Sequence, residues 1–352
     1  MMHASDQVWS AYRKLKRFVY YTKNDLELRQ RLATFERAAD FESRLNAVRA
    51  VVDSPNPSDT SLFQQWLAEI RYRVVPKRFI DQRDTPAHAT AGRLISNVTT
   101  AETYTVCKVN YFFEGPIELH LIAVVWIIRE GVVLDHGLGK ECYGSRLERA
   151  VKAPEDRSAA LFKKYHEMYS GWRDSGINKA AELLVRDGES VCVLGLDIQE
   201  FYYHVRADFK GIADVVKRSR LPTSVAGQCG RAGNLTSCIQ KIGQTFHGRI
   251  ASHLAVTNSG LPPGEGLPIG LCSSPVIANW YLRDLDRAIL KEVRPAYYGR
   301  YLDDIIIVTV SHDDPTKEQE PVETFADHLL VKPGVFPKGA DGRYEVAALP
   351  GM

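Results

Sequence analysis

The chain has 352 residues, of which 45% are hydrophobic and 25% are charged, so it can bury a substantial core as one large domain or two coupled ones. Its six cysteines include no CxxC pair, which excludes the usual patterns of a disulfide framework or a zinc site. The formal net charge of +2 neither demands nor excludes a nucleic-acid partner.

Targeting signals are not evident in the sequence. The N-terminal segment is basic but lacks the apolar core and cleavage site of a signal peptide. The most apolar stretch, residues 119–128 (LHLIAVVWII), is too short to span a bilayer. We therefore expect a soluble, cytoplasmic protein that does not contact a membrane.

The first third of the chain predicts helices followed by a hairpin. Asn24 and Glu27 form a capping-box pattern, and apolar residues at helical spacing continue as far as Val52. A loop with two prolines ends this helix, and a shorter helix is expected over residues 62–72. The segments YTVCKVNYFF and IELHLIAVVWII are rich in β-branched and aromatic residues, and the EGP link between them predicts a β-hairpin.

The remaining elements alternate between helix and strand. Residues 162–185 indicate a helix, and residues 190–198 (SVCVLGLDI) indicate a buried strand. A helix and a hairpin are expected within residues 205–264, and residues 276–290 are again helical. This order predicts an α+β fold with an antiparallel sheet.

Two adjacent aspartates interrupt an apolar strand near the end of this pattern. Asp303 and Asp304 precede the run IIIV, so they lie next to the core. Neighbours in a regular strand face opposite sides of the sheet, but a tight turn would present both carboxylates near one edge. An ordinary aspartate-rich hairpin turn is the alternative. Burying unpaired carboxylates is costly, and metal coordination is one of the few remedies.

Asp197 ends a second apolar strand in the same manner, although a lone aspartate there is also a common turn or cap residue. Two strands that each deliver an aspartate suggest a shared cation site. Carboxylate oxygens suit Mg²⁺ or Mn²⁺. Two such ions would stabilise the attacking and leaving oxygens of a phosphoryl transfer.

A glycine-rich segment, residues 264–282 (GEGLPIGLCSSPVIANWYL), is the third element of interest. Its glycines let the backbone approach a ligand closely, and Ser274 followed by Pro275 predicts a helix N-cap and first helical residue. Taken alone, the pattern indicates either a loop that faces phosphate or sugar, or a plain loop before an amphipathic helix.

The segments DIQEFYYHV, GLPIGLCSSPVIAN and YLDD resemble, in this order, motifs A, B and C of reverse transcriptases. Upstream, RYRVVPKRF and CYGSRL resemble fingers segments of bacterial reverse transcriptases. The spelling LPIG at residues 267–270 and the CYGSRL segment are most like the group of antiphage defence and abortive infection. The resemblance implies right-hand polymerase fingers and palm with an antiparallel palm sheet, and a thumb that is absent or truncated. The implied domains are an N-terminal helical region (1–58), a fingers-like region with a β-hairpin (59–190) and a palm with motifs A, B and C (191–352).

The resemblance also assigns roles to individual residues. The implied catalytic residues are Asp197, Asp303 and Asp304. The implied metal-binding set is Asp197, Ile198, Asp303 and Asp304. The implied nucleotide-binding set is Phe201, Tyr202, Pro268, Ile269 and Gly270. Within it, Tyr202 matches the aromatic steric gate that excludes a ribose 2′-hydroxyl, and core packing is the favoured role of Phe201. Candidates for triphosphate or template contacts, against a plain surface role, are Lys77 and Arg146.

The implied function is RNA-directed DNA synthesis by a nucleotidyltransferase that uses two Mg²⁺ ions, or Mn²⁺, in bacterial antiviral defence. Its partners would be an RNA or DNA template and primer and dNTPs, and a protein partner or homo-oligomer is left open. Ile269 departs from the glutamine that most of the family has, which predicts weaker template-guided selection. Lys332 and Lys338 both fit the lysine of motif D that protonates pyrophosphate.

Three alternatives to this function are left open. The same site could carry out template-independent or protein-primed DNA synthesis. The chain could instead be a nucleic-acid-binding scaffold with a palm fold and no processive activity. A different palm enzyme, such as a nucleotide cyclase or an RNA-templated RNA polymerase, is disfavoured by Tyr202 and by YLDD.

Overall fold

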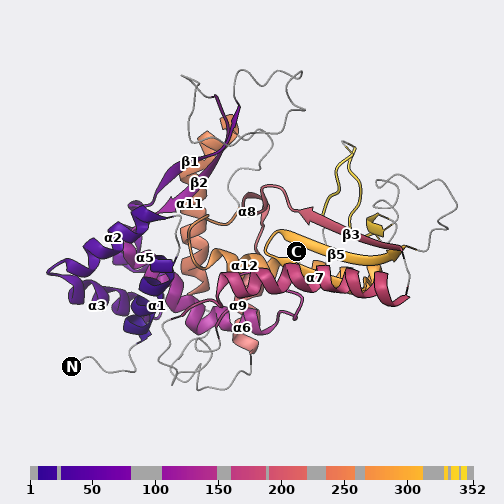
Figure 1. Ribbon diagram of the computed structural model, residues 1–352. Helices are drawn as coiled ribbons and strands as arrows, with labels where there is room; N and C mark the ends of the chain where they lie inside the picture. Colours follow the sequence, from indigo (N-terminus) through magenta and orange to yellow (C-terminus); the bar gives the residue numbers. More distant parts are fainter. Residues whose placement is uncertain are drawn as a thin grey trace.

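The computed structural model shows a helical N-terminal region, a two-stranded arm and a three-stranded sheet with helices packed on it (Figure 1). The residues that the structure describes are 7–21, 25–80, 105–148, 160–187, 190–219, 235–257, 266–311, 329–331, 334–340 and 342–346. One large hydrophobic core connects the helical region, the arm and one face of the sheet.

The described residues of the N-terminal region form four α-helices: α1 (Gln7–Tyr21), α2 (Leu26–Arg37), α3 (Phe41–Val52) and α4 (Ser61–Ala68). The prediction of one helix up to Val52 was wrong, because the chain leaves the helix after Arg37 and starts a new one at Phe41. The cap of α2 is Asp25, whose side chain accepts a hydrogen bond from Leu28 N (3.0 Å). Asn24 lies outside the described residues.

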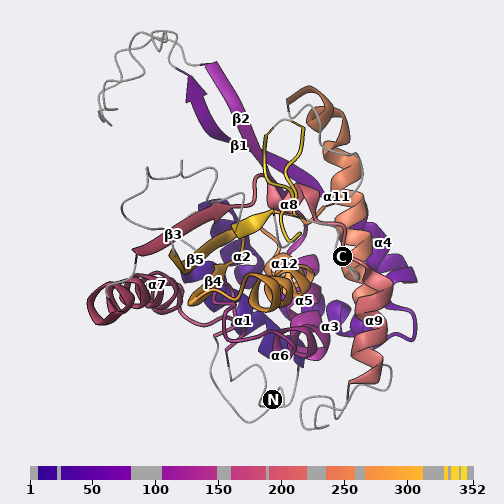
Figure 2. The same cartoon turned by 90° about the vertical axis from the view of Figure 1, so that its right-hand side faces the viewer.

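The arm consists of β1 (Arg71–Ile80) and β2 (Thr105–Glu114), which pair in antiparallel fashion and extend away from the body (Figures 1 and 2). The expected helix over 62–72 ends at Ala68 because Arg71 already belongs to β1. The hairpin prediction was also wrong, since the segment after β2 is helix α5 (Ile117–Trp126). All ten residues of α5 are buried, so its sequence is apolar on every side and shows no helical period.

The three-stranded sheet has the order β3-β5-β4, with both pairs antiparallel. Its strands are β3 (Ser190–Asp197), β4 (Tyr297–Tyr301) and β5 (Asp304–Ser311). Helix α7 (Tyr165–Asp187) covers one face, where it packs on Val308 (Figure 2). On the other face Ile305 and Ile307 join the main core. The strand prediction for β3 is confirmed, but the strand lies at the sheet edge and is not fully buried, as Val193 is 52% exposed.

Helices connect the two sheets. After β3 come α8 (Phe201–His204), α9 (Phe209–Arg218) and α11 (Thr236–Thr257), and α11 packs along α5 and both strands of the arm. The predicted hairpin between residues 205 and 264 does not occur in the described part of that segment. The predicted helix over 276–290 is confirmed as α12 (Ser274–Tyr281), α13 (Arg283–Ala288) and η5 (Ile289–Val293). Short helices elsewhere in the described part of the chain are η1 (Pro57–Asp59), η3 (Ile127–Gly131) and α6 (Val132–His136).

These elements agree with the expected α+β class and its antiparallel sheets. None of the helices within the described residues combines the length and the apolar character needed to cross a membrane.

Candidate active site

The aspartates that the sequence singles out meet at one end of the three-stranded sheet. Asp197, the last residue of β3, is the direct cross-strand partner of Asp304, the first residue of β5. Tyr301 also pairs with Asp304, so Leu302 and Asp303 form the two-residue turn between β4 and β5. The Ile198 amide donates a hydrogen bond to the Asp303 carbonyl (3.1 Å). Directly opposed side chains share a face of the sheet, so the carboxylates of Asp197 and Asp304 project from the same face.

The environment of this turn disfavours negative charge. Burial, followed by the charges of Asp304 and Asp197, raises the pKa of Asp303 to about 6, against the lowering effects of a backbone hydrogen bond and of Lys77. Burial and the charge of Asp197 also raise the pKa of Asp304. Mutual repulsion of this kind is what a bound cation would relieve.

The carboxylates do not by themselves complete a metal cage. Within the described ranges, no group of three or more His, Cys, Asp or Glu side chains is arranged to hold a metal ion. Mg²⁺ in phosphoryl-transfer sites is commonly held by only one or two carboxylates, with water and substrate phosphates filling the other positions. The donor set at the turn therefore fits an ion that binds together with a nucleotide.

Tyr202 lies beside the carboxylates, in the short helix α8 that follows Asp197. Burial, followed by the charge of Asp303, raises the pKa of Tyr202, so the phenol is neutral and close to the carboxylate. Its neighbour Phe201 is only 4% exposed and packs in the main core. This burial favours the core-packing role of Phe201, and its nucleotide contact stays a prediction.

The loop at residues 268–270 is fixed between Tyr202 and the arm. Leu267 N donates to the Tyr202 carbonyl (2.7 Å), and Phe113 N donates to the Ile269 carbonyl (2.7 Å). Ser274 Oγ donates to the Pro268 carbonyl (2.7 Å) and so braces the loop, and the N-cap position belongs to Ser273. Gly270 has a φ of 95°, a left-handed conformation that favours glycine. Pro268, Ile269 and Gly270 thus form one edge that is held between Tyr202 and the arm.

Residues 145–331 match the reverse transcriptase (RNA-dependent DNA polymerase) family. The match covers more than half of the chain and includes the three aspartates, Tyr202 and the 268–270 loop. The chain belongs to the reverse transcriptase family. It is accordingly an RNA-directed DNA polymerase, a nucleotidyltransferase that acts on dNTPs with a nucleic-acid template and primer. No curated protein matches the chain in sequence.

The basic residues expected near the substrate behave differently from one another. Lys77 is an exposed residue of β1, and its charge lowers the pKa of Asp303, so the arm brings a cation towards the carboxylates. Arg146 instead donates to Asp135 Oδ1 (2.9 Å) and to the carbonyl groups of Asp135, Gly139 and Cys142. Four of its five N–H donors are thereby occupied, which argues against the expected phosphate or template contact.

The structure does not distinguish between the two candidates for the motif D lysine, Lys332 and Lys338. Lys332 lies outside the described residues. Lys338 is exposed, and its Nζ lies 5.5 Å from the ring centroid of Tyr344.

Behind the turn, a buried ion pair holds the reverse transcriptase site in place, and sequence reasoning did not find it. Arg300 is fully buried and donates from Nε and Nη2 to the two carboxylate oxygens of Asp286 in α13 (both 2.7 Å). Its Nη1 donates to the Leu302 carbonyl and to Asn279 Oδ1 (both 3.0 Å). The Tyr298 hydroxyl donates to Asp286 Oδ1 (2.5 Å). We call Arg300, Asp286, Asn279 and Tyr298 the arginine network.

This network supports a turn that is strained. Leu302 has a φ of 57°, in the left-handed region that a branched side chain rarely adopts. Its carbonyl is the one that Arg300 holds. A buried ion pair is stabilising only when its hydrogen bonds are satisfied, and here Arg300 has partners on α12, on α13 and in the turn.

The segment around Gly144 packs against the same turn, on the side opposite the carboxylates. Tyr143 N donates to the Arg300 carbonyl, and Arg300 N donates to the Glu141 carbonyl (both 2.8 Å). Asn279 Nδ2 donates to the Gly144 carbonyl (2.7 Å). A Cβ at Gly144 would lie 2.6 Å from Leu302 N, so only glycine fits this approach. The CYGSRL segment therefore supports the turn that carries Asp303.

Proposed function

We propose that this reverse transcriptase adds deoxynucleotides by two-metal phosphoryl transfer at the edge formed by Asp197, Asp303 and Asp304, and that it serves bacterial antiviral defence. The observation that carries the catalytic part is the register of β3 and β5, which sets Asp197 opposite Asp304 and next to the Asp303 turn. The defence role rests on the LPIG and CYGSRL segments, which resemble those of defence-associated enzymes.

Asp197 and Asp303 would hold Mg²⁺, or Mn²⁺, with Asp304 and the backbone of Ile198 beside them. When bound, the ions supply positive charge to the attacking and leaving oxygens of the phosphoryl transfer. The raised pKa of Asp303 supports this assignment, because a site built to receive a cation has excess negative charge before the cation binds.

The other residues would position the nucleotide. The ring of Tyr202 would lie under the sugar and exclude a 2′-hydroxyl group. Pro268, Ile269 and Gly270 would face the nascent base pair, and Lys77 would reach the triphosphate from the arm. The hydrogen bond between Phe113 and Ile269 supports this arrangement, because it joins the arm to the loop.

The division into an N-terminal helical region (1–58), fingers (59–190) and palm (191–352) is part of this proposal. The β1–β2 arm would be the core of the fingers. Helix α7 falls within the middle segment, but it packs on the three-stranded sheet and would serve the palm.

Primer extension tests the proposal. The full chain is supplied with Mg²⁺, dNTPs and a primer on an RNA or a DNA template. Asp303→Asn, which keeps the size of the side chain but removes its charge, should reduce incorporation by about 10²–10³-fold, the range attributed to electrostatic stabilisation of a transition state. The matched control is Asp284→Asn, because Asp284 pairs with Arg283 and Arg287 on the surface of α13.

Incorporation by Asp303→Asn at the rate of the control would refute the two-metal assignment. Extension without a template would instead support template-independent synthesis at the same site. Labelling of the protein itself by a radioactive dNTP would support protein-primed synthesis.

A further inference from the structure

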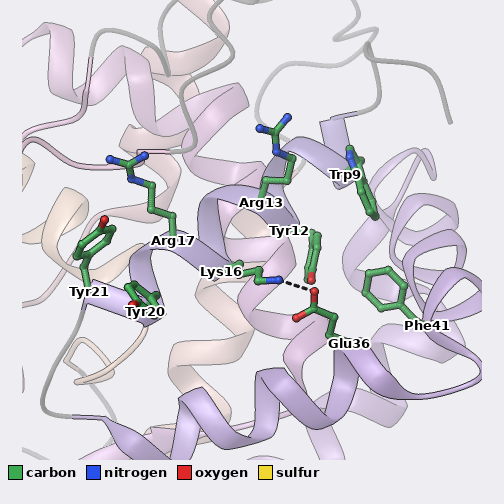
Figure 3. A pocket seen from close by; sticks show the side chains of 9 residues that line it. All are labelled: Trp9, Tyr12, Arg13, Lys16, Arg17, Tyr20, Tyr21, Glu36 and Phe41. Atoms are coloured by element: carbon green, nitrogen blue, oxygen red, sulfur yellow. Dashed lines mark hydrogen bonds and ion pairs between the residues drawn. The ribbon is translucent and has the colours of Figure 1, made fainter.

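The N-terminal helical region contains a groove outside the part of the chain that matches the reverse transcriptase family (Figure 3). Its volume is about 640 Å³, which is in the range of ligand sites. The lining residues come mostly from α1, with one each from α2 and α3: Trp9, Tyr12, Arg13, Lys16, Arg17, Tyr20, Tyr21, Glu36 and Phe41.

The groove carries excess positive charge. Lys16 forms an ion pair with Glu36, which is the single acidic side chain of the lining. No carboxylate of the described residues forms an ion pair with Arg13 or Arg17, which are both exposed. Figure 3 shows these two arginines extending from the same side of α1. A ligand with repeated negative charge would complement them.

Aromatic rings lie at both ends of this positive surface. Tyr20 and Tyr21 are 64% and 66% exposed, and they lie at the end of the groove opposite Trp9 (Figure 3). The Arg29 guanidinium carbon lies 5.5 Å from the Tyr20 ring centroid, and that of Arg17 lies 5.4 Å from the Tyr21 centroid. Exposed rings beside cations are the arrangement on which unpaired bases stack while their phosphates are bound.

We propose that this groove binds a single-stranded nucleic acid, with Arg13 and Arg17 on phosphates and with Tyr20 and Tyr21 stacked on bases. Three cations make the lining unsuited to an apolar peptide. Helix α1 is also anchored to the polymerase part, because the Phe18 ring packs on Phe162 (centroids 5.6 Å apart) and Lys14 Nζ donates to the Ala160 carbonyl. The site therefore adds a second contact for a strand that is already a substrate of the family, and it does not depend on the two-metal assignment.

The test is fluorescence anisotropy of a labelled oligonucleotide of about 12 nucleotides, RNA or DNA, added to the full chain without dNTPs and titrated between about 50 and 200 mM salt. Replacing both Arg13 and Arg17 by alanine should weaken binding and lower the slope of log K against log salt by about 1.4, which is two phosphate contacts at about 0.7 each. Replacing Tyr20 and Tyr21 by alanine should weaken binding at least about fivefold and leave the slope unchanged.

The matched control is the double change of Lys217 and Arg218 to alanine, because these exposed cations of α9 lie outside the groove. It should leave affinity and slope within error. The proposal is overturned if the control behaves like the arginine variant, if neither groove variant loses affinity, or if an acidic peptide binds the groove and the oligonucleotide does not. All four exchanged groove residues are exposed, so the variants should fold, which circular dichroism verifies.

Discussion

Replacing Arg300 by lysine tests whether the arginine network positions the catalytic turn. The variant keeps a positive charge in the core but loses the two-point contact with Asp286. A single ammonium group also cannot reach Asp286 and the Leu302 carbonyl in the way the guanidinium does. The turn would then be free to shift, and with it Asp303.

The expected loss of stability and the expected loss of activity differ in size, so they can be measured separately. Breaking a buried ion pair by removing one partner costs about 3–5 kcal/mol, and lysine should leave the loss near the lower limit because it retains the charge. A domain with a free energy of unfolding of about 5–15 kcal/mol can remain folded at that cost. A displacement of the carboxylate by about 1 Å is expected to reduce kcat about 100-fold, with little change in KM for the dNTP.

Tyr298→Phe provides the matched control. It removes one hydrogen bond to the same Asp286 carboxylate, worth about 1.5–3 kcal/mol, but it does not touch the turn. Denaturant unfolding and steady-state primer extension are measured for both variants at a temperature where both are folded. We expect Tyr298→Phe to keep kcat within about threefold of the wild type, which is below 1 kcal/mol in the barrier. If Arg300→Lys does the same, the network only stabilises the fold and the positioning argument is wrong.

Four further predictions concern single residues. Gly144→Ala should reduce kcat at least about tenfold, because the new Cβ would lie 2.6 Å from Leu302 N. Gly171→Ala is the control and should leave kcat unchanged, because its Cβ would lie 3.7 Å from the nearest atom. Steady-state kinetics of both variants test this difference. Tyr202→Ala should raise the ratio of ribonucleotide to deoxynucleotide incorporation, and an unchanged ratio would show that the ring is structural. Ile269→Gln should raise the selection of the template-matched nucleotide roughly fivefold, as expected for a contact of about 1 kcal/mol, and sequencing of the products made on a heteropolymeric template measures it. If the unchanged protein already copies that template faithfully, the premise is wrong. Burial lowers the pKa of His120 to about 3, so the unfolded chain binds a proton at a higher pH than the folded chain does. The free energy of unfolding should therefore fall as the pH drops from about 6.5 towards 3. In acid unfolding curves, His120→Phe should make this fall in the free energy of unfolding smaller.

The site aspartates could be predicted because local sequence specifies the strands that carry them. The apolar runs before Asp197 and after Asp304 indicate strands, and antiparallel pairing then brings the two ends together. Leu302 at the turn could not be predicted, because its left-handed conformation contradicts the preference of its side chain. It is held by Arg300 and by the close approach of Gly144, which are tertiary contacts.

The errors have a common physical origin in burial. Helix α5 was taken for a strand because a fully buried helix loses the polar face that reveals its period. The sequence leaves Arg146 open between a phosphate or template contact and a surface role, because its sequence neighbours do not show the carbonyl groups that it binds. One signal for the arginine network was available, since Arg300 is a charged residue in a strand otherwise expected to be buried, and such a charge requires a partner. Its partner Asp286 lies in a helix that sequence alone does not place next to β4.

The two sides of the turn that carries Asp303 differ in charge balance: charges are paired on one side and repel each other on the other. On the back, Arg300 and Asp286 neutralise each other, and neither needs a ligand. On the side of the carboxylates, Asp303 and Asp304 have raised pKa values, and the charge of Lys77 lowers the pKa of Asp303. The repulsion there would tend to open the turn, and the arginine network together with the Gly144 contact opposes that tendency before any cation arrives. The turn is thus held from behind by the Leu302–Arg300 hydrogen bond and the Gly144 contact, so the positions of its carboxylates are set by tertiary packing rather than by a bound cation.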